Sequence, residues 1–176
     1  MIKIETERLI LRNIVDKDAA DIFEYAKEIN VGPNAGWKPH ESIEETKEIM
    51  KQIFIDQPNV FGMVLKANNK MVGSIGLIED PKRTNPYAKM LGYAMSEHYW
   101  GQGLMTEASK AIIDFGFKDS QTHIITCSCY TFNKRSRRVI EKSGFKHEGC
   151  LRQCELRYDG KVMDIDIFSL LREEYL

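Results

Sequence analysis

The sequence predicts an α+β (mixed α/β) domain with one central sheet and helices packed on its faces. Strand and helix patterns follow one another in the order βααβββαβαββ along the 176 residues. Turn signals such as Asn68-Asn69 and Asp159-Gly160 connect neighbouring strand patterns directly, which indicates a sheet joined largely by hairpins. No repeat, low-complexity tract or long linker divides the chain, so we expect a single domain over residues 1–176.

Seven segments have the apolar alternation, or the continuous apolar run, that is typical of a β-strand bounded by turn residues. The last two segments, which flank the Asp159-Gly160 turn, have the weakest alternation. Strands are predicted over residues 6–13, 60–66, 71–78, 90–96, 122–132, 145–158 and 161–171.

Four segments are predicted to be helices, and three of them carry apolar residues at helical spacing. Asp16 is expected to cap the first helix, and Ser42 with Glu45 has the capping-box form expected at the start of the second. The period changes again at Leu104, where the third helix begins, and the fourth follows Asn133. In the first helix, Ala19, Phe23, Ala26 and Ile29 are expected near one face. Helices are predicted over residues 16–30, 42–56, from 104 onward, and 133–144.

Composition and charge exclude several classes of function. The formal net charge is -1 and the pI is near 6.4, so no overall basic field favours nucleic acid or an anionic membrane. No apolar run approaches the roughly 20 residues that span a bilayer, and the N-terminal segment lacks the apolar core of a signal peptide. We therefore expect a cytoplasmic protein in which any anion site is local.

The four cysteines do not predict a metal site. Cys127, Cys129, Cys150 and Cys154 have the spacings C-x-C and C-x-x-x-C, whereas zinc sites more often use C-x-x-C pairs. Without an export signal, disulfides are not expected either. The four side chains are expected to be small apolar fillers on strands, with no bound metal.

Two glycines, Gly101 and Gly103, lie where a strand pattern stops and a helical pattern starts. The first amides of a helix and its dipole favour an anion, and glycine lets a ligand approach the backbone closely. This arrangement fits a pyrophosphate site or an ordinary turn. A Rossmann motif would need glycine where Thr106 stands, and a P-loop would need Gly-Lys-Ser/Thr where Gly103 precedes Leu104.

A second signal follows about thirty residues later. Asn133 comes between a predicted strand and a predicted helix and is a good N-cap, with Ser136 on the first turn. The basic residues around Ser136 form a local cluster for which a solvated helix face is the alternative explanation. These basic residues are Lys134, Arg135, Arg137 and Arg138.

Together the motifs resemble the GNAT acetyltransferases. The resemblance rests on the phosphate motif that ends in Gly101 and Gly103, the Asn-x-x-Ser helix start, and the helix end E-K-S-G-F. The segments "TERLILRNI", "EGCLRQCEL" and "DIDIFSLLREEY" resemble the RimJ/RimL-type branch, the ribosomal-protein N-terminal acetyltransferases. The resemblance covers nearly the whole chain, from about Thr6 to Leu176. His98 departs from it, because this first motif position is usually Gln or Arg.

The resemblance implies that acetyl-CoA lies where two parallel strands, 90–96 and 122–131, splay apart within a mostly antiparallel sheet. The pantetheine arm is expected to pair with the backbone of the first strand, as an added strand would. Asn133 is expected to hold a pantetheine amide, and His98 to contribute through its backbone N–H. The cofactor-binding residues implied are Ala94, Met95, His98, Trp100, Gly101, Gln102, Gly103, Leu104 and Asn133.

Matching the branch also implies two catalytic residues. Glu155 is expected to be the general base that deprotonates the attacking amine, directly or through one water. The alternative is an exposed strand residue paired with Arg152 or Arg157. Ser136 is expected to serve the departing thiolate, although a phenol, Tyr93 or Tyr130, could replace it. A backbone amide near Ala94 is the implied donor to the developing oxyanion.

The acceptor is expected to be a protein N-terminal α-amino group. With a pKa near 8, such a group is about 10% neutral at pH 7, whereas a lysine is almost entirely charged. The alternatives are a small amine (amino acid, polyamine or aminoglycoside) or a non-catalytic acyl-CoA-binding module. The loop predicted over 30–40 would line the acceptor site, with Trp37 as a platform or a plug. Glu41, Glu44 and Glu45 would form an acidic pocket or serve as first-turn charges, and a homodimer is compatible with the resemblance.

Overall fold

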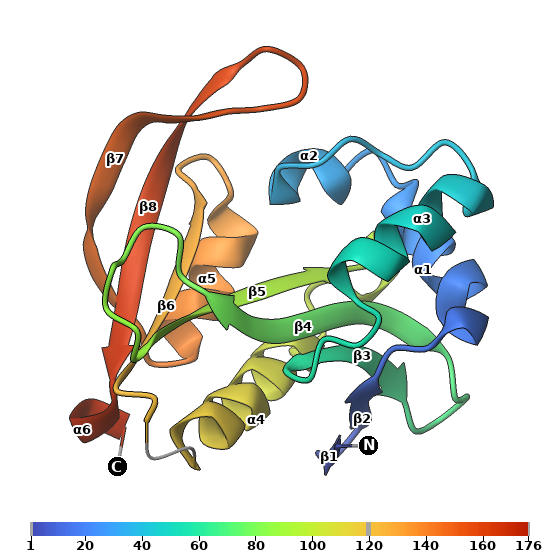
Figure 1. Cartoon of the computed structure of the whole chain (residues 1–176), viewed down its shortest axis with the longest axis horizontal. Helices are drawn as coiled ribbons and strands as arrows, with labels where there is room; N and C mark the ends of the chain where they lie inside the picture. Colours follow the sequence, from blue (N-terminus) through green and yellow to red (C-terminus); the bar gives the residue numbers. More distant parts are fainter. Residues whose placement is uncertain (1, 119–120, 176) are drawn as a thin grey trace. The chain divides into compact units, whose positions relative to one another are not determined.

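The computed structural model describes residues 2–118 and 121–175 and contains two compact units (Figure 1). Unit 1 comprises Met1–Gly76 and Tyr93–Ala108, and unit 2 comprises Leu77–Gly92 and Ser109–Leu176. The single domain expected over residues 1–176 stays a prediction.

Within the described residues, eight strands are hydrogen-bonded in the order β1-β2-β3-β4-β5-β6-β8-β7. The β5–β6 pair is parallel, whereas the β1–β2, β2–β3, β3–β4, β6–β8 and β7–β8 pairs are antiparallel. The predicted mixed, mostly antiparallel sheet is therefore confirmed. The strands are β1 Lys3–Glu5, β2 Leu9–Asn13, β3 Val60–Leu65, β4 Met71–Glu79, β5 Ala88–Met95, β6 Ile124–Tyr130, β7 Lys146–Leu156 and β8 Val162–Leu171.

The four predicted helices are present, and the sequence pattern missed two short ones, α2 and α6. The helices are α1 Ala19–Ala26, α2 Gly32–Ala35, α3 Ile43–Ile53, α4 Leu104–Lys118, α5 Lys134–Lys142 and α6 Arg172–Tyr175. Two 3-10 turns, η1 Asp16–Asp18 and η2 Glu97–Tyr99, precede α1 and α4. The predicted cap of α3 is confirmed, because Ser42 Oγ accepts a hydrogen bond from the Glu45 amide at 3.1 Å.

The first predicted strand begins three residues later than expected. A short strand, β1, precedes it, and β2 begins only at Leu9. The Thr6 amide donates to Leu9 O at 3.0 Å and closes a turn over residues 6–9. This turn carries Arg8.

The prediction for the first helix was wrong at both ends. Asp18, not Asp16, directs the start: its carboxylate accepts from the Val15 amide at 2.9 Å and from both terminal nitrogens of Arg12. The helix ends at Ala26, whose carbonyl accepts from the His40 amide at 3.0 Å. Ile29, expected on the apolar face, is 77% exposed.

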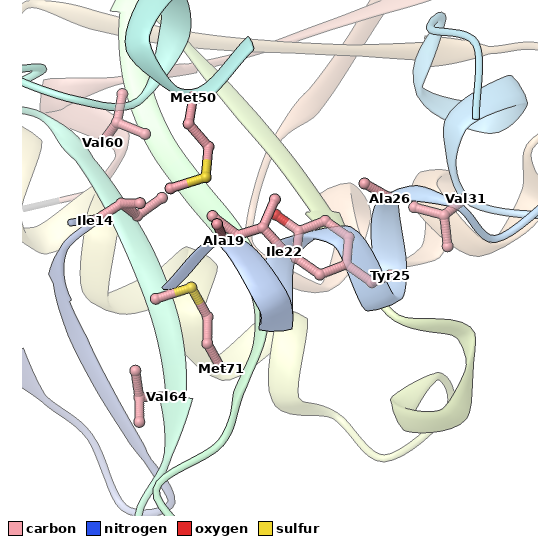
Figure 2. Packing of buried hydrophobic residues seen from close by; sticks show 10 residues of the cluster. All are labelled: Ile14, Ala19, Ile22, Tyr25, Ala26, Val31, Met50, Val60, Val64 and Met71. Atoms are coloured by element: carbon pink, nitrogen blue, oxygen red, sulfur yellow. The ribbon is translucent and has the colours of Figure 1, made fainter. Parts of the chain in front are cut away.

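The core of unit 1 lies between helices and sheet. Helices α1 and α3 pack side by side on the face of β3 that carries Val60 and Val64, and Met50 of α3 is fully buried there (Figure 2). The opposite face of β3 is buried as well, through Phe61 and Met63. Each such buried apolar side chain contributes about 1.5–3 kcal/mol, so this sheet is a firm support for the segments attached to it.

In unit 2 the C-terminal part of α4 lies close on the sheet. A Cβ at Gly116 would lie 2.5 Å from Leu77 Cδ1 and 3.0 Å from Ile125 Cδ1, so a larger residue there would displace the tips of these side chains. Strands β7 and β8 form a long hairpin (Figure 1). Its turn is closed by the Arg157 amide, which donates to Lys161 O at 2.8 Å, and Gly160 adopts φ 79°. This confirms the predicted hairpin turn at Asp159-Gly160.

The cysteines are unpaired and fall into two groups. Cys127 and Cys129 are buried on β6, and burial raises the pKa of both thiols. Cys150 and Cys154 are exposed on β7, so their expected role as apolar fillers was wrong. In the part of the chain that the structure describes, no three His, Cys, Asp or Glu side chains are grouped to hold a metal ion. Across the same residues, no helix has the length and apolarity needed to cross a membrane.

Candidate active site

The glycine turn joins β5 to α4 in unit 1 and has the predicted backbone form. Gly101 and Gly103 both adopt left-handed conformations, with φ 78° and 80°. Nothing lies within 4 Å of the position that a Cβ would occupy at Gly101. A side chain is therefore disfavoured at both positions, and the surface beside Gly101 is open to a ligand.

Helix α4 starts directly after this turn. The Glu107 amide donates to Gly103 O at 3.0 Å, which is the first helical hydrogen bond. The amides of residues 104–106 lie ahead of that bond, at the positive end of the helix dipole. The amide of Trp100, one of the predicted cofactor-binding residues, already donates to Glu97 O at 3.1 Å at the end of η2.

Side chains within the turn fix its shape. Gln102 Nε2 donates to His98 O at 3.2 Å, and the Trp100 indole donates to Met95 O at 2.9 Å. His98 is exposed, and its carbonyl rather than its imidazole takes part in this contact. Its predicted contribution through the backbone N–H, like the predicted role of Leu104, stays a prediction.

The parallel pairing of β5 and β6 is short. It covers Ala88–Met90 and Ile124–Thr126, although β5 continues to Met95 and β6 to Tyr130. Beyond Thr126, β6 keeps its antiparallel partner β8. The separation of the two strands expected beyond this pairing stays a prediction. Ala94 and Met95 follow on β5, where the Ala94 carbonyl lies so close to Gly73 that a Cβ there would be 2.4 Å from it.

Asn133 caps α5 in unit 2, as predicted. Its side-chain oxygen accepts from the Ser136 amide at 3.1 Å. Ser136 lies beside Cys129: burial raises the pKa of this thiol to about 11, and a hydrogen bond with the Ser136 hydroxyl lowers it. The half-buried hydroxyl of Ser136 thus contacts a thiol of the protein itself.

Glu155, on β7, contacts Tyr130, on β6. The Tyr130 hydroxyl donates to Glu155 Oε1 at 2.5 Å, and the Tyr130 side chain is buried. Burial and the neighbouring carboxylate raise the pKa of Tyr130 well above its usual range, so the phenol stays protonated and donates. Glu155 is half-buried, and Arg157 pairs with Asp159 instead, which disfavours the alternative of an exposed Glu155 paired with Arg157.

A bulge in β7 directs Glu155. The register with β8 changes between Leu151 and Glu155, so β7 carries extra residues at this point. Gln153 adopts φ 50°, and its amide donates to the Asp164 carboxylate at 2.7 Å, which fixes the bulge. Bulges commonly redirect a side chain beside a functional site. The sequence did not predict this bulge, because no glycine or proline stands within it.

The segment expected to line the acceptor site contains α2 and is well packed. A Cβ at Gly32 would lie 2.8 Å from the Trp37 ring, and that ring contacts His40 at 5.3 Å between centroids. These contacts favour the plug over the platform for Trp37. Glu44 and Glu45 lie in the first turn of α3, where Glu45 accepts from the Glu41 amide at 2.6 Å, and Glu41 pairs with Lys38. The acidic pocket and the first-turn charges both stay predictions.

Comparisons with known proteins identify the family of the chain. A sequence profile described as "Acetyltransferase (GNAT) domain" matches residues 8–146. The chain is 28% identical over 176 residues to the uncharacterized N-acetyltransferase p20 of Bacillus licheniformis, covering 97% of this chain and 96% of that protein. It is 27% identical over 182 residues to the ribosomal protein uS5-alanine N-acetyltransferase of Escherichia coli, covering 99% of this chain and 93% of that protein.

Solved structures show the same fold. A GNAT-family acetyltransferase of Bacillus anthracis superposes with a TM-score of 0.87 at 25% identity, covering 98% of this chain and all of that one. The spermidine N-acetyltransferase of Vibrio cholerae, solved with CoA and spermine, superposes with a TM-score of 0.78 at 21% identity. The match covers 97% of this chain and 99% of that one. The profile match covers well over half of the sequence, and the chain therefore belongs to the GNAT family of N-acetyltransferases, as its motifs predicted.

Proposed function

We propose that the protein transfers the acetyl group of acetyl-CoA to a primary amine by direct attack, with a protein N-terminal α-amino group as the acceptor. The observation that carries the proposal is the glycine turn of unit 1. It combines two left-handed glycines, an open surface at Gly101 and the start of a fifteen-residue helix at Leu104.

The turn fits a pyrophosphate. The amides of Gly101, Gly103 and Leu104 would donate to its oxygens, and the dipole of α4 would add favourable charge. Acetyl-CoA supplies the thioester whose acetyl group is transferred. The backbone of Ala94 and Met95 is proposed to pair with the pantetheine arm, and the Asn133 amide to bind it in addition to capping α5.

In unit 2, Glu155 is the proposed general base. It removes a proton from the ammonium form of the acceptor, and the neutral nitrogen attacks the thioester carbonyl. The new C–N bond forms as the C–S bond breaks, and the nitrogen gives up its second proton, which protonates the CoA thiolate so that CoA leaves as the thiol. Ser136 is the proposed partner of that thiolate, and Tyr130 keeps the Glu155 carboxylate oriented through its hydrogen bond.

The acceptor class rests on chemistry and on one relative. The Escherichia coli relative is named for acetylating an alanine of ribosomal protein uS5. An N-terminal α-amino group with a pKa near 8 needs only a carboxylate base at neutral pH. A lysine would need its pKa lowered by burial before the same base could serve it.

The proposal is tested by turnover of purified protein with acetyl-CoA. The acceptors would be peptides with N-terminal Ala, Ser or Met, the same peptides with a blocked N-terminus, polyamines and aminoglycosides. We expect thiol release with the open peptides, and a product whose added acetyl mass maps to the first residue. Turnover only with polyamines or aminoglycosides would show that the acceptor is a small amine and not a protein N-terminus. CoA binding without turnover would indicate a non-catalytic module.

A further inference from the structure

Arg8 connects the N-terminal segment to the first turn of α4. Glu107 lies in that turn, and its carboxylate accepts from Thr6 Oγ1 at 2.5 Å, from the Arg8 amide at 2.8 Å and from Arg8 Nε at 2.8 Å. All of these residues belong to unit 1. Nothing in the predicted site residues pointed to this cluster, which is named here the Arg8–Glu107 clamp (Thr6, Arg8 and Glu107).

The clamp holds the glycine turn itself. Arg8 Nη1 donates to Gln102 O at 2.9 Å, and Gln102 is the residue between the two glycines. Arg8 Nη2 lies 3.5 Å from the position that a Cβ would take at Gly103. The guanidinium therefore lies against both residues of the Gln102–Gly103 peptide.

Holding the Gln102 carbonyl determines the direction of the Gly103 amide. In a planar trans peptide the C=O and N–H bonds point in opposite directions. With the carbonyl turned toward Arg8, the Gly103 N–H points away from the guanidinium. Rotation of this peptide plane changes ψ of Gln102 and φ of Gly103, and glycine adopts a wide range of φ, so without Arg8 the plane could rotate at little cost.

The ionisation of Glu107 keeps the clamp charged. Burial acts to raise the pKa of Glu107, but the hydrogen bonds from Thr6 and Arg8 outweigh it and hold this pKa below its ordinary value. The Glu107 side chain is 16% exposed, and the Arg8 side chain is 44% exposed. An ion pair with one partner this exposed contributes little to folding, so stability alone does not account for the arrangement.

We propose that Arg8, fixed by Glu107, is a positioning residue that holds the Gln102–Gly103 peptide in the orientation that binds the pyrophosphate of acetyl-CoA. This inference rests on the proposed function. It adds that the phosphate turn is preorganised by a side chain from the opening segment of the chain rather than by its glycines alone.

The test compares Arg8→Gln with Arg8→Lys and with the double variant Arg8→Gln/Glu107→Gln. For Arg8→Gln we expect the Kd of CoA and the KM of acetyl-CoA to rise about tenfold, the effect of losing a charge-assisted hydrogen bond. The kcat at saturating acetyl-CoA should stay within about twofold of wild type. Arg8→Lys should be intermediate, because an ammonium lacks the fork that reaches two acceptors at once.

An acetyl donor that lacks the pyrophosphate distinguishes a defect in pyrophosphate binding from a general loss of activity. With S-acetylpantetheine, Arg8→Gln and wild type should have the same kcat/KM. Arg12→Gln is the matched control, because Arg12 pairs with Asp18 in the same unit and lies outside the turn. It should leave the Kd of CoA unchanged. The double variant Arg8→Gln/Glu107→Gln should bind CoA no more weakly than Arg8→Gln.

The results that would contradict the positioning role of Arg8 differ from the result that would contradict the proposed function. Wild-type affinity for CoA in Arg8→Gln would overturn the positioning role while leaving the proposed function intact. An equal loss with S-acetylpantetheine would also overturn it, since the damage would then not concern the pyrophosphate. Failure of the wild-type protein to bind CoA would remove the proposed function and this inference together.

Discussion

The glycine turn of unit 1 and the Tyr130–Glu155 pair of unit 2 are built in opposite ways. The turn offers backbone groups, and its shape depends on two left-handed glycines and on a carbonyl held by Arg8. The pair offers side chains, and its geometry depends on a strand bulge and on one hydrogen bond. A backbone site should therefore be sensitive to conformation, whereas a side-chain site should be sensitive to the identity of single functional groups.

The largest effect is expected at the side-chain site. Glu155→Gln keeps the shape and removes the base, so kcat should fall by about 10²–10⁴ while the Kd of acetyl-CoA changes little. Single-turnover kinetics and CoA titration measure the two quantities separately. The matched control is Glu148→Gln, on the same strand but paired with Arg83 and Ser169, which should retain nearly full kcat. An unchanged kcat in Glu155→Gln at every pH would remove the base assignment.

At the backbone site, Gly103→Val should abolish tight binding of acetyl-CoA. Valine at φ 80° is strained by roughly 1–2 kcal/mol, and its side chain would enter the space beside Arg8, so we expect at least a thirtyfold rise in Kd. Gly160→Val carries the same strain at φ 79° in the β7–β8 turn. That control should lower the Tm without changing the Kd, and equal affinities of Gly103→Val and wild type would contradict a turn-based site.

A smaller effect is expected when the pair loses only its hydrogen bond. Tyr130→Phe keeps the ring that stacks on Phe132 but removes the donor to Glu155. We expect kcat to fall about tenfold, which corresponds to one hydrogen bond to a charged group, with the KM of acetyl-CoA unchanged. A change confined to that KM would mean that Tyr130 contacts the donor substrate instead of orienting the base.

The smallest effect on activity is expected outside both regions. The hydrogen bonds from Arg12 and Val15 outweigh burial and hold the pKa of Asp18 below its ordinary value. A lowered folded-state pKa contributes stability that is present at neutral pH and is lost as the pH falls through that value. Arg12→Gln should therefore lower the Tm more at pH 7 than at pH 3, with kcat nearly unchanged. An equal Tm loss at both pH values would show that the ion pair is not its cause.

The parts of the fold that the sequence predicted are those with a local signal. The change of period at Leu104, the Asn133 cap and the Asp159-Gly160 turn each depend on residues within a few positions, and all three are confirmed. The family followed from the same kind of evidence, because its motifs are short and appear in order.

The parts that the sequence missed depend on distant contacts. Asp18 rather than Asp16 starts the first helix because Arg12, on the preceding strand, reaches it. The sequence alone indicates only an acidic residue in the first turn of a helix at Glu107, since its partner Arg8 lies 99 positions away. The contact between Tyr130 and Glu155 likewise requires the β7 bulge, which the sequence pattern does not contain.

The central claim is direct transfer from acetyl-CoA to an amine with Glu155 as base. The most direct measurement is thiol release by the wild-type protein with acetyl-CoA, with and without an N-terminally open peptide, followed by the mass of the intact protein. We expect thiol release only when the peptide is present, with no acetylated protein, and a rate of release at least a hundredfold lower in Glu155→Gln. Release equal to the protein concentration without peptide, together with an acetylated chain, would contradict it.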